Sequence, residues 1–138
     1  MLDQREIDQL LEAASETMNN AYSPYSGIRV GAALMDSDGG IHTGCNVENS
    51  SYSLTICAER NAVFKAVAEG ARGFKGMVVV SDTERVQSPC GACRQVLWEF
   101  DPGLQIVFVS GGRTRGYLLS ELLPQAFSLN EEEDSADG

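Results

Sequence analysis

The sequence predicts an α/β protein, a three-layer α/β/α sandwich built on a mixed five-stranded sheet. The first observation behind this prediction is a hairpin pattern in residues 28–47, followed by alternating helical and strand patterns. The second is that the later strand segments are apolar without alternation, which is typical of strands covered on both faces. The third is the length of 138 residues with 43% hydrophobic content, which suits one core and one domain.

The N-terminal half is expected to contain a helix and then the hairpin. The segment YSPYSG, residues 22–27, contains Pro24 and Gly27 and ends the helix. A turn at residues 37–40, with two glycines available for positive φ, joins the two hairpin strands. The helix is predicted over residues 3 to about 21 from apolar side chains at helical spacing, which are Leu2, Ile7, Leu10, Leu11, Ala14 and Met18.

Two further helices alternate with strands in the second half of the chain. The helix of residues 57–70 has an apolar stripe, and Gly70 suits the position just after its end. A third helix begins within residues 88–100, where Ser88 is the expected N-cap and Pro89 lies in the first turn. Crossovers through these two helices would make the later strands parallel. The remaining segments are a buried strand within residues 73–82, another within 104–110, and an edge strand with a short helical piece within 114–127.

Charge and composition argue against nucleic-acid and membrane partners. The chain has 20 acidic and 10 basic residues without a clustered basic face, which is unsuited to binding a phosphate backbone. The longest apolar run, around residues 76–80, is too short to span a bilayer. The charged N-terminus lacks the apolar core of a signal peptide, so we expect a cytoplasmic protein with reduced cysteines. We expect one domain at residues 1–128, followed by an acidic tail at residues 129–138.

Three of the four cysteines suit a zinc site. Cys90 and Cys93 form a C-x-x-C at the start of the third helix, a spacing at which two thiolates can bind one tetrahedral zinc ion. Cys57 begins the other crossover helix, and helix N-termini that follow parallel strands gather at one edge of a sheet. The sequence therefore predicts one zinc ion per chain, bound by these three residues.

Three protein ligands indicate a catalytic zinc site, because such a site keeps one position open for water. Cys45, at the end of a strand, is interpreted as a small buried hydrophobic residue and not as a fourth ligand. Three thiolates around Zn²⁺ leave a formal charge of −1, which helix N-termini and a nearby cation have to offset. Arg60 is the first candidate for this cation and Arg94 the second; a surface ion pair is the other interpretation of Arg60.

Glu59 lies two positions beyond Cys57, in the first turn of its helix. From there its carboxylate can reach a water molecule beside the metal without being a ligand, which is the arrangement of a proton shuttle. A first-turn acidic residue also interacts favourably with the helix dipole, and this interpretation needs no chemistry. Beside three suitably spaced cysteines, the catalytic interpretation is favoured.

The order of these motifs resembles the small, homotetrameric, zinc-dependent cytidine deaminases. C-A-E followed by P-C-x-x-C is the signature of zinc-dependent nucleoside and nucleobase deaminases, and five sequence blocks in order, with Cys and not His at the first ligand position, are specific to that branch. The resemblance covers nearly the whole chain, through YSPYSGIRVGAAL (22–34), GCNVENSSYS (44–53), CAERNAVFKAVAEG (57–70), SPCGACRQVL (88–97) and ELLPQAFS (121–128).

The resemblance implies hydrolytic deamination of cytidine and 2′-deoxycytidine to uridine and 2′-deoxyuridine, with release of ammonia, in pyrimidine salvage. It implies that Glu59 is the general acid/base, which protonates N3 of cytosine and assists the departure of ammonia after attack at C4. It further implies that Arg60 tempers the thiolate charge, and that neighbouring subunits of a homotetramer complete each pocket.

The resemblance also implies that Asn46 and Glu48 hold the sugar. Residues two apart in an extended segment share a face, and a carboxylate accepts hydrogen bonds from ribose hydroxyls. Capping of a polar loop is the structural alternative for both residues.

The resemblance also implies further pocket residues, some of which come from a neighbouring subunit. Phe127 and the loop around Ser50 and Tyr52 would reach the pocket of a neighbouring subunit, unless Phe127 packs in the local core. Ile28 stands where many relatives carry Phe, so the base would meet an apolar wall without an aromatic face. Asn61 stands where relatives often have a small hydroxyl residue.

Two other functions stay open. A deaminase of a modified cytosine nucleoside, such as a nucleoside antibiotic, would differ in the sugar-side loop, and NVEN at residues 46–49 favours an unmodified ribose. A non-catalytic, zinc-stabilised binding module would require a blocked pocket or a fourth protein ligand, for which Cys45 is the candidate.

Overall fold

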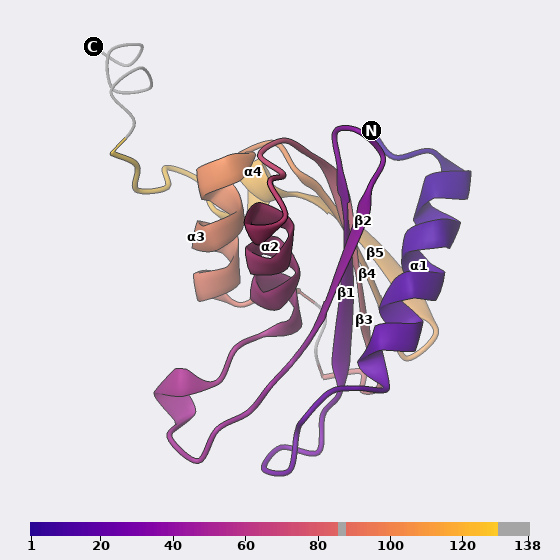
Figure 1. Cartoon of the computed structure of the whole chain (residues 1–138), viewed down its shortest axis with the longest axis vertical. Helices are drawn as coiled ribbons and strands as arrows, with labels where there is room; N and C mark the ends of the chain where they lie inside the picture. Colours follow the sequence, from indigo (N-terminus) through magenta and orange to yellow (C-terminus); the bar gives the residue numbers. More distant parts are fainter. Residues whose placement is uncertain (86–87, 130–138) are drawn as a thin grey trace.

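A five-stranded sheet between two layers of helices forms the computed structural model, which describes residues 1–85 and 88–129 (Figure 1). α1 covers one face of the sheet, and α2 and α3 cover the other (Figure 1). The predicted α/β/α sandwich is therefore confirmed. In chain order the elements are α1 (Gln4–Met18), β1 (Val30–Asp36), β2 (Ile41–Cys45), the 3-10 helix η1 (Tyr52–Leu54), α2 (Ala58–Ala68), β3 (Phe74–Ser81), α3 (Gly91–Phe100), β4 (Gln105–Ser110), β5 (Arg113–Leu118) and α4 (Leu119–Leu122).

The sheet is mixed, with the strand order β2-β1-β3-β4-β5. β1 is antiparallel to both β2 and β3, β3 and β4 are parallel, and β5 returns antiparallel to β4. The crossover through α3 thus produces the predicted parallel pair, and β5 is the predicted edge strand. Ser81 and Ser110 pair at the ends of the two parallel strands, so these strands finish at the same edge of the sheet.

Side chains of the central strands alternate between two hydrophobic clusters. In β3, Met77 and Val79 pack in the cluster that includes α2 and α3, whereas Val78 and Val80 pack in the cluster that includes α1. Because both faces of this strand are covered, both sets of side chains are apolar. This explains why the sequence of β3 shows no polar alternation.

Capping side chains and backbone turns set the helix ends. Asp3 caps α1 in a reciprocal pair of hydrogen bonds with Glu6. α1 ends at Met18, three residues before the predicted end, because the chain then extends so that Tyr22 N–H can donate to the Asn46 carbonyl (2.9 Å). Gly70 lies just after the end of α2, as predicted: it adopts a φ of 100°, and the amide of the following residue donates back to the last turn of the helix.

Gly44 allows β2 to lie directly against the first turns of α2. A Cβ atom at this position would lie 2.4 Å from the amide nitrogen of Ala62 and 2.6 Å from the carbonyl oxygen of Ala58. Any side chain would therefore push the helix away from the strand. This close approach fixes the height of the start of α2, and with it Cys57, above the sheet.

The predicted division at residue 128 stays a prediction, since residues 130–138 lie outside the described part of the chain. Among the residues that are described, helices of the length and apolar character needed to cross a bilayer do not occur.

Candidate active site

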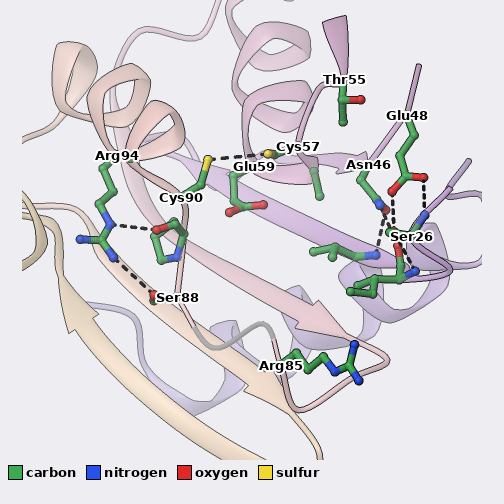
Figure 2. Close-up of a pocket in the computed structure, with 15 residues that line it drawn as sticks. Ser26, Asn46, Glu48, Thr55, Cys57, Glu59, Arg85, Ser88, Cys90 and Arg94 are labelled. Carbon is green, nitrogen blue, oxygen red and sulfur yellow. Dashed lines mark hydrogen bonds between the residues drawn. The ribbon is translucent and has the colours of Figure 1, made fainter. Parts of the chain in front are cut away.

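The starts of α2 and α3 meet at one edge of the sheet and bring three thiols together. Cys57 is the N-cap of α2, and Cys90 is the N-cap of α3. The Sγ atoms of Cys57 and Cys90 are 3.7 Å apart (Figure 2). Those of Cys90 and Cys93 are 3.3 Å apart. All three sulfur atoms lie within 4.8 Å of one another. The topological argument from the sequence therefore placed the cysteines correctly.

The predicted N-cap of α3 is wrong. Ser88 does not cap the helix; Cys90 does, with its Sγ accepting from the Cys93 backbone N–H (3.5 Å). Pro89 accordingly precedes the cap and is not part of the first turn. The Ser88 hydroxyl accepts instead from Arg94 Nη2 (3.3 Å). A hydroxyl is the commoner cap, but here a sulfur atom that faces the metal site occupies the same position.

The three thiols fit one zinc ion. Zinc–sulfur bonds of about 2.3 Å in a tetrahedral arrangement place sulfur atoms about 3.8 Å apart, close to the spacing found here. Within residues 1–85 and 88–129, these thiols are the group that could hold a metal ion, and Cys45 is not part of it. Cys45 is half-buried, and burial raises the pKa of its thiol, as suits a reduced structural cysteine. The described residues thus leave a fourth coordination position for water.

Hydrogen bonds to Cys57 favour its thiolate. A hydrogen bond with the Cys93 thiol, followed by one from Arg60, lowers the pKa of Cys57 to about 5. The same interaction with Cys57, together with burial, raises the pKa of Cys93. Arg60 Nη2 lies 3.5 Å from Cys57 Sγ and also donates to the Thr55 carbonyl (3.3 Å). The guanidinium of Arg60 is therefore in direct contact with a sulfur atom of the cluster.

Arg94, the second candidate for charge balance, contacts oxygen atoms instead. Its guanidinium donates to the carbonyls of Pro89 (2.8 Å) and Leu122 (2.7 Å) and to the hydroxyl of Ser88 (3.3 Å). These three bonds tie the segment before Cys90 to the end of α4.

Glu59 lies in the first turn of α2 and its carboxylate is directed into a pocket (Figure 2). Only 5% of the residue is exposed, and burial raises the pKa of Glu59 to about 7. Because this value is near neutrality, the carboxyl group can both take up and release a proton under ordinary conditions.

The pocket has a volume of about 810 Å³ and runs from the cysteines to the loop after β2. This volume is in the range of sites that bind small organic molecules. Of the residues that the sequence singled out, it brings together Ile28, Asn46, Glu48, Cys57, Glu59, Cys90 and Arg94. It also includes residues to which the sequence gave no role in the site, namely Ser26, Val30, Thr55, Ala58, Arg85, Ser88, Pro89 and Gly91.

Asn46 and Glu48 are buried and anchored by the segment that leads into β1. The Asn46 side chain accepts from Val30 N–H (2.9 Å) and donates to the Ile28 carbonyl (2.8 Å). Glu48 accepts hydrogen bonds from the hydroxyl and backbone of Ser26, which lower the pKa of Glu48 and keep it ionised. These contacts join residues about 20 positions apart, so no local motif could have revealed them.

Tyr52 and Phe127 do not line the pocket of their own chain. Tyr52 is 76% exposed and Phe127 is 70% exposed. The alternative that Phe127 packs in the local core is therefore wrong. Ser50 contacts Tyr25 through a hydrogen bond between the two hydroxyls (2.6 Å).

Comparisons with known proteins agree with this geometry. The family described as "Cytidine and deoxycytidylate deaminase zinc-binding region" matches residues 4–109. A cytidine deaminase of Sporosarcina psychrophila is 48% identical over 128 residues, which cover 91% of this chain and 94% of the relative. The chain belongs to the cytidine deaminase family. Zinc is accordingly the cofactor, and the three-cysteine cluster is positioned to hold one ion per chain.

Solved structures and a more distant relative add detail to this family assignment. The crystal structure of a cytidine deaminase from Burkholderia pseudomallei has a TM-score of 0.84 and 45% identity, and the match covers 91% of this chain and all of the other. A blasticidin-S deaminase of Bacillus cereus is 30% identical over 130 residues, covering 88% of this chain and 92% of the relative. This more distant relative is thus named for the deamination of blasticidin S and not of cytidine.

We expect one zinc ion per chain in the purified protein, measured by elemental analysis. Replacing Cys57 or Cys93 by Ser should remove most of the zinc and lower the melting temperature, because a ligand that binds only the folded state stabilises it. Cys45→Ser is the matched control and should keep one zinc ion per chain. Loss of zinc from Cys45→Ser would instead identify a fourth ligand and support a non-catalytic module.

Proposed function

We propose that this chain hydrolyses cytidine and 2′-deoxycytidine to uridine and 2′-deoxyuridine, with release of ammonia. The observation that carries the proposal is that one pocket is lined by two of the three clustered thiols, Cys57 and Cys90, by the buried carboxylate of Glu59 and by the anchored residues Asn46 and Glu48. The relatives named cytidine deaminase, at close to half identity over most of the chain, support the same reaction.

Water and a proton carrier are the two requirements of this reaction. Zinc held by Cys57, Cys90 and Cys93 would supply the Lewis acidity that makes water a nucleophile at neutral pH. Glu59 would take a proton from that water and donate it to N3 of cytosine as C4 is attacked. It would then take the proton of the hydroxyl group newly bound to C4 and transfer it to the departing amino group as the C4–N bond breaks. Water and cytidine thus become uridine and ammonia, and Glu59 returns to its starting ionisation state.

Neighbouring side chains would bind the substrate and balance charge. Asn46 and Glu48 would bind the sugar, since both are buried, lie on one wall of the pocket and are held by backbone contacts. Ile28 would form an apolar wall beside the base. Arg60 would offset the negative charge of the thiolates through its contact with Cys57.

Assembly is part of the proposal. We infer a homotetramer in which Phe127 and Tyr52 contribute to the pocket of a neighbouring subunit, which would account for two large aromatic side chains exposed on a single chain. The expected location is the cytoplasm, where the thiols stay reduced.

The proposal is tested by offering the zinc-loaded protein a panel of substrates and following ammonia release and ultraviolet absorbance. We expect turnover of cytidine and 2′-deoxycytidine, and kcat/KM at least about tenfold lower for cytosine nucleoside antibiotics, because the anchored sugar-side loop suits an unmodified ribose. If only an antibiotic substrate were turned over, the chain would be a deaminase of modified cytosine nucleosides and the proposed activity would be wrong.

Glu59→Gln should keep its zinc and its fold but lose at least about 100-fold in kcat, because the amide cannot carry a proton. In the wild-type enzyme, kcat/KM should fall about tenfold per pH unit below about 7, where Glu59 becomes protonated and can no longer accept a proton from water. A flat acid limb, or normal turnover by a zinc-loaded Glu59→Gln variant, would contradict the role given to this residue.

The contribution of Phe127 across an interface can be tested by mixing inactive variants. Light scattering should give the mass of four 14.9 kDa chains for the wild type. Glu59→Gln and Phe127→Ala should each be weakly active alone, but subunit exchange should restore activity, because some pockets then combine Glu59 of one chain with Phe127 of another. A monomeric mass, or no gain on mixing, would show that Phe127 does not act in this way.

A further inference from the structure

Asn61 connects the start of α2 to the end of β2. Its backbone N–H donates to the Cys57 carbonyl (3.1 Å), as part of the first turn of the helix. Its side-chain Nδ2 donates to the Cys45 carbonyl (2.8 Å). Cys45 is the last residue of β2 and directly precedes Asn46. The Asn61 side chain thus joins the start of α2, which carries the metal ligand Cys57, to the end of β2, which leads to Asn46 in the pocket.

The Cys45 carbonyl is available for this bond because β2 is an edge strand. Hydrogen-bonded and non-hydrogen-bonded pairs alternate along an antiparallel ladder. The next pair is hydrogen-bonded, since Asn46 N–H donates to the Val30 carbonyl (3.3 Å), so the Gly31–Cys45 pair is not. The carbonyl of Cys45 therefore points away from β1, toward Asn61.

A second connection lies on the other side of Asn46. Val47 and Ile56 exchange two backbone hydrogen bonds, each 3.0 Å long, and Ile56 directly precedes Cys57. Asn46 is thus located between two anchors, one through Asn61 and one through the Val47–Ile56 bridge. Removing the Asn61 carboxamide would break the connection that precedes Asn46 and leave the Val47–Ile56 bridge that follows it in place.

We propose that Asn61 is a positioning residue that holds Asn46, a proposed sugar-binding residue, at a fixed position relative to Glu59. The proposal rests on the proposed function, because it concerns a nucleoside whose sugar contacts Asn46 while its base faces Glu59. A displacement of the reacting atoms by about 1 Å is enough to lower a rate markedly. Loss of the anchor should therefore affect turnover more than binding.

The test uses Asn61→Ala and Asn61→Leu, since Ala and Leu favour the helix more than Asn does and Leu keeps much of the side-chain volume. We expect kcat on cytidine to fall by about tenfold and KM to change by less than about threefold, with one zinc ion per chain retained. The matched control is Arg72→Ala, which removes a side-chain bond to the Val67 carbonyl (3.0 Å) at the far end of α2. This control should have the kcat of the wild type.

Amide hydrogen exchange gives a second readout that does not depend on activity. The amides of residues 46–48 should exchange at least about fivefold faster in both Asn61 variants and at the wild-type rate in Arg72→Ala. A lower melting temperature with unchanged kcat and unchanged exchange at residues 46–48 would reduce Asn61 to a structural residue and overturn the proposal. If the wild type does not deaminate cytidine, the proposed function fails, while the exchange measurement still tests the anchor.

Discussion

Three sulfur atoms within 4.8 Å of one another are the constraint on which the rest of the site depends. Thiolates at such a separation repel strongly in a partly buried site, so they require positive charge from their surroundings. Two helix N-termini supply part of it, because Cys57 and Cys90 are themselves N-caps. A metal ion supplies most of the rest. The topology serves this requirement, since both crossover helices begin at the edge of the sheet where the parallel strands end.

The placement of α2 against β2 links the metal cluster to the polar wall of the pocket. Gly44 lets the strand backbone lie against the first turns of the helix, and Asn61 then reaches the next carbonyl along the strand. Glu59 lies on the same first turn of α2 and is buried, and this burial raises the pKa of its carboxyl group to about 7. The contact between α2 and β2 thus connects Cys57 and Glu59, at the start of the helix, to the strand end that leads to Asn46.

Local spacing and topology made much of this arrangement predictable from the sequence. C-x-x-C, a third cysteine at a second helix start and the unalternating strand patterns specified the cluster and the layered sheet. The N-cap of α3 was predicted wrongly, because propensity favours the Ser88 hydroxyl and takes no account of a sulfur atom that faces a metal site. The contacts of Ser26 with Glu48 and of Asn61 with Cys45 join distant segments and have no local pattern. Tyr52 and Phe127 contact the pocket only if a second chain supplies them.

Two arginines follow catalytic-site residues directly, yet they serve different purposes. Arg60 follows Glu59 and donates to Cys57 Sγ, so its charge acts on the cluster itself. Arg94 follows Cys93, but its guanidinium donates to three oxygen atoms, on Ser88, Pro89 and Leu122. A planar guanidinium presents five donors in a fixed geometry that suits several acceptors at fixed positions, whereas a lysine ammonium has three donors on one nitrogen atom. Arg94 therefore fixes the backbone that leads into Cys90, and Arg60 alone makes a direct contact with sulfur among the described arginines. Arg60 lies three residues after the N-cap of α2 and Arg94 four residues after the N-cap of α3, and this difference of one position accompanies the different directions of the two guanidinium groups.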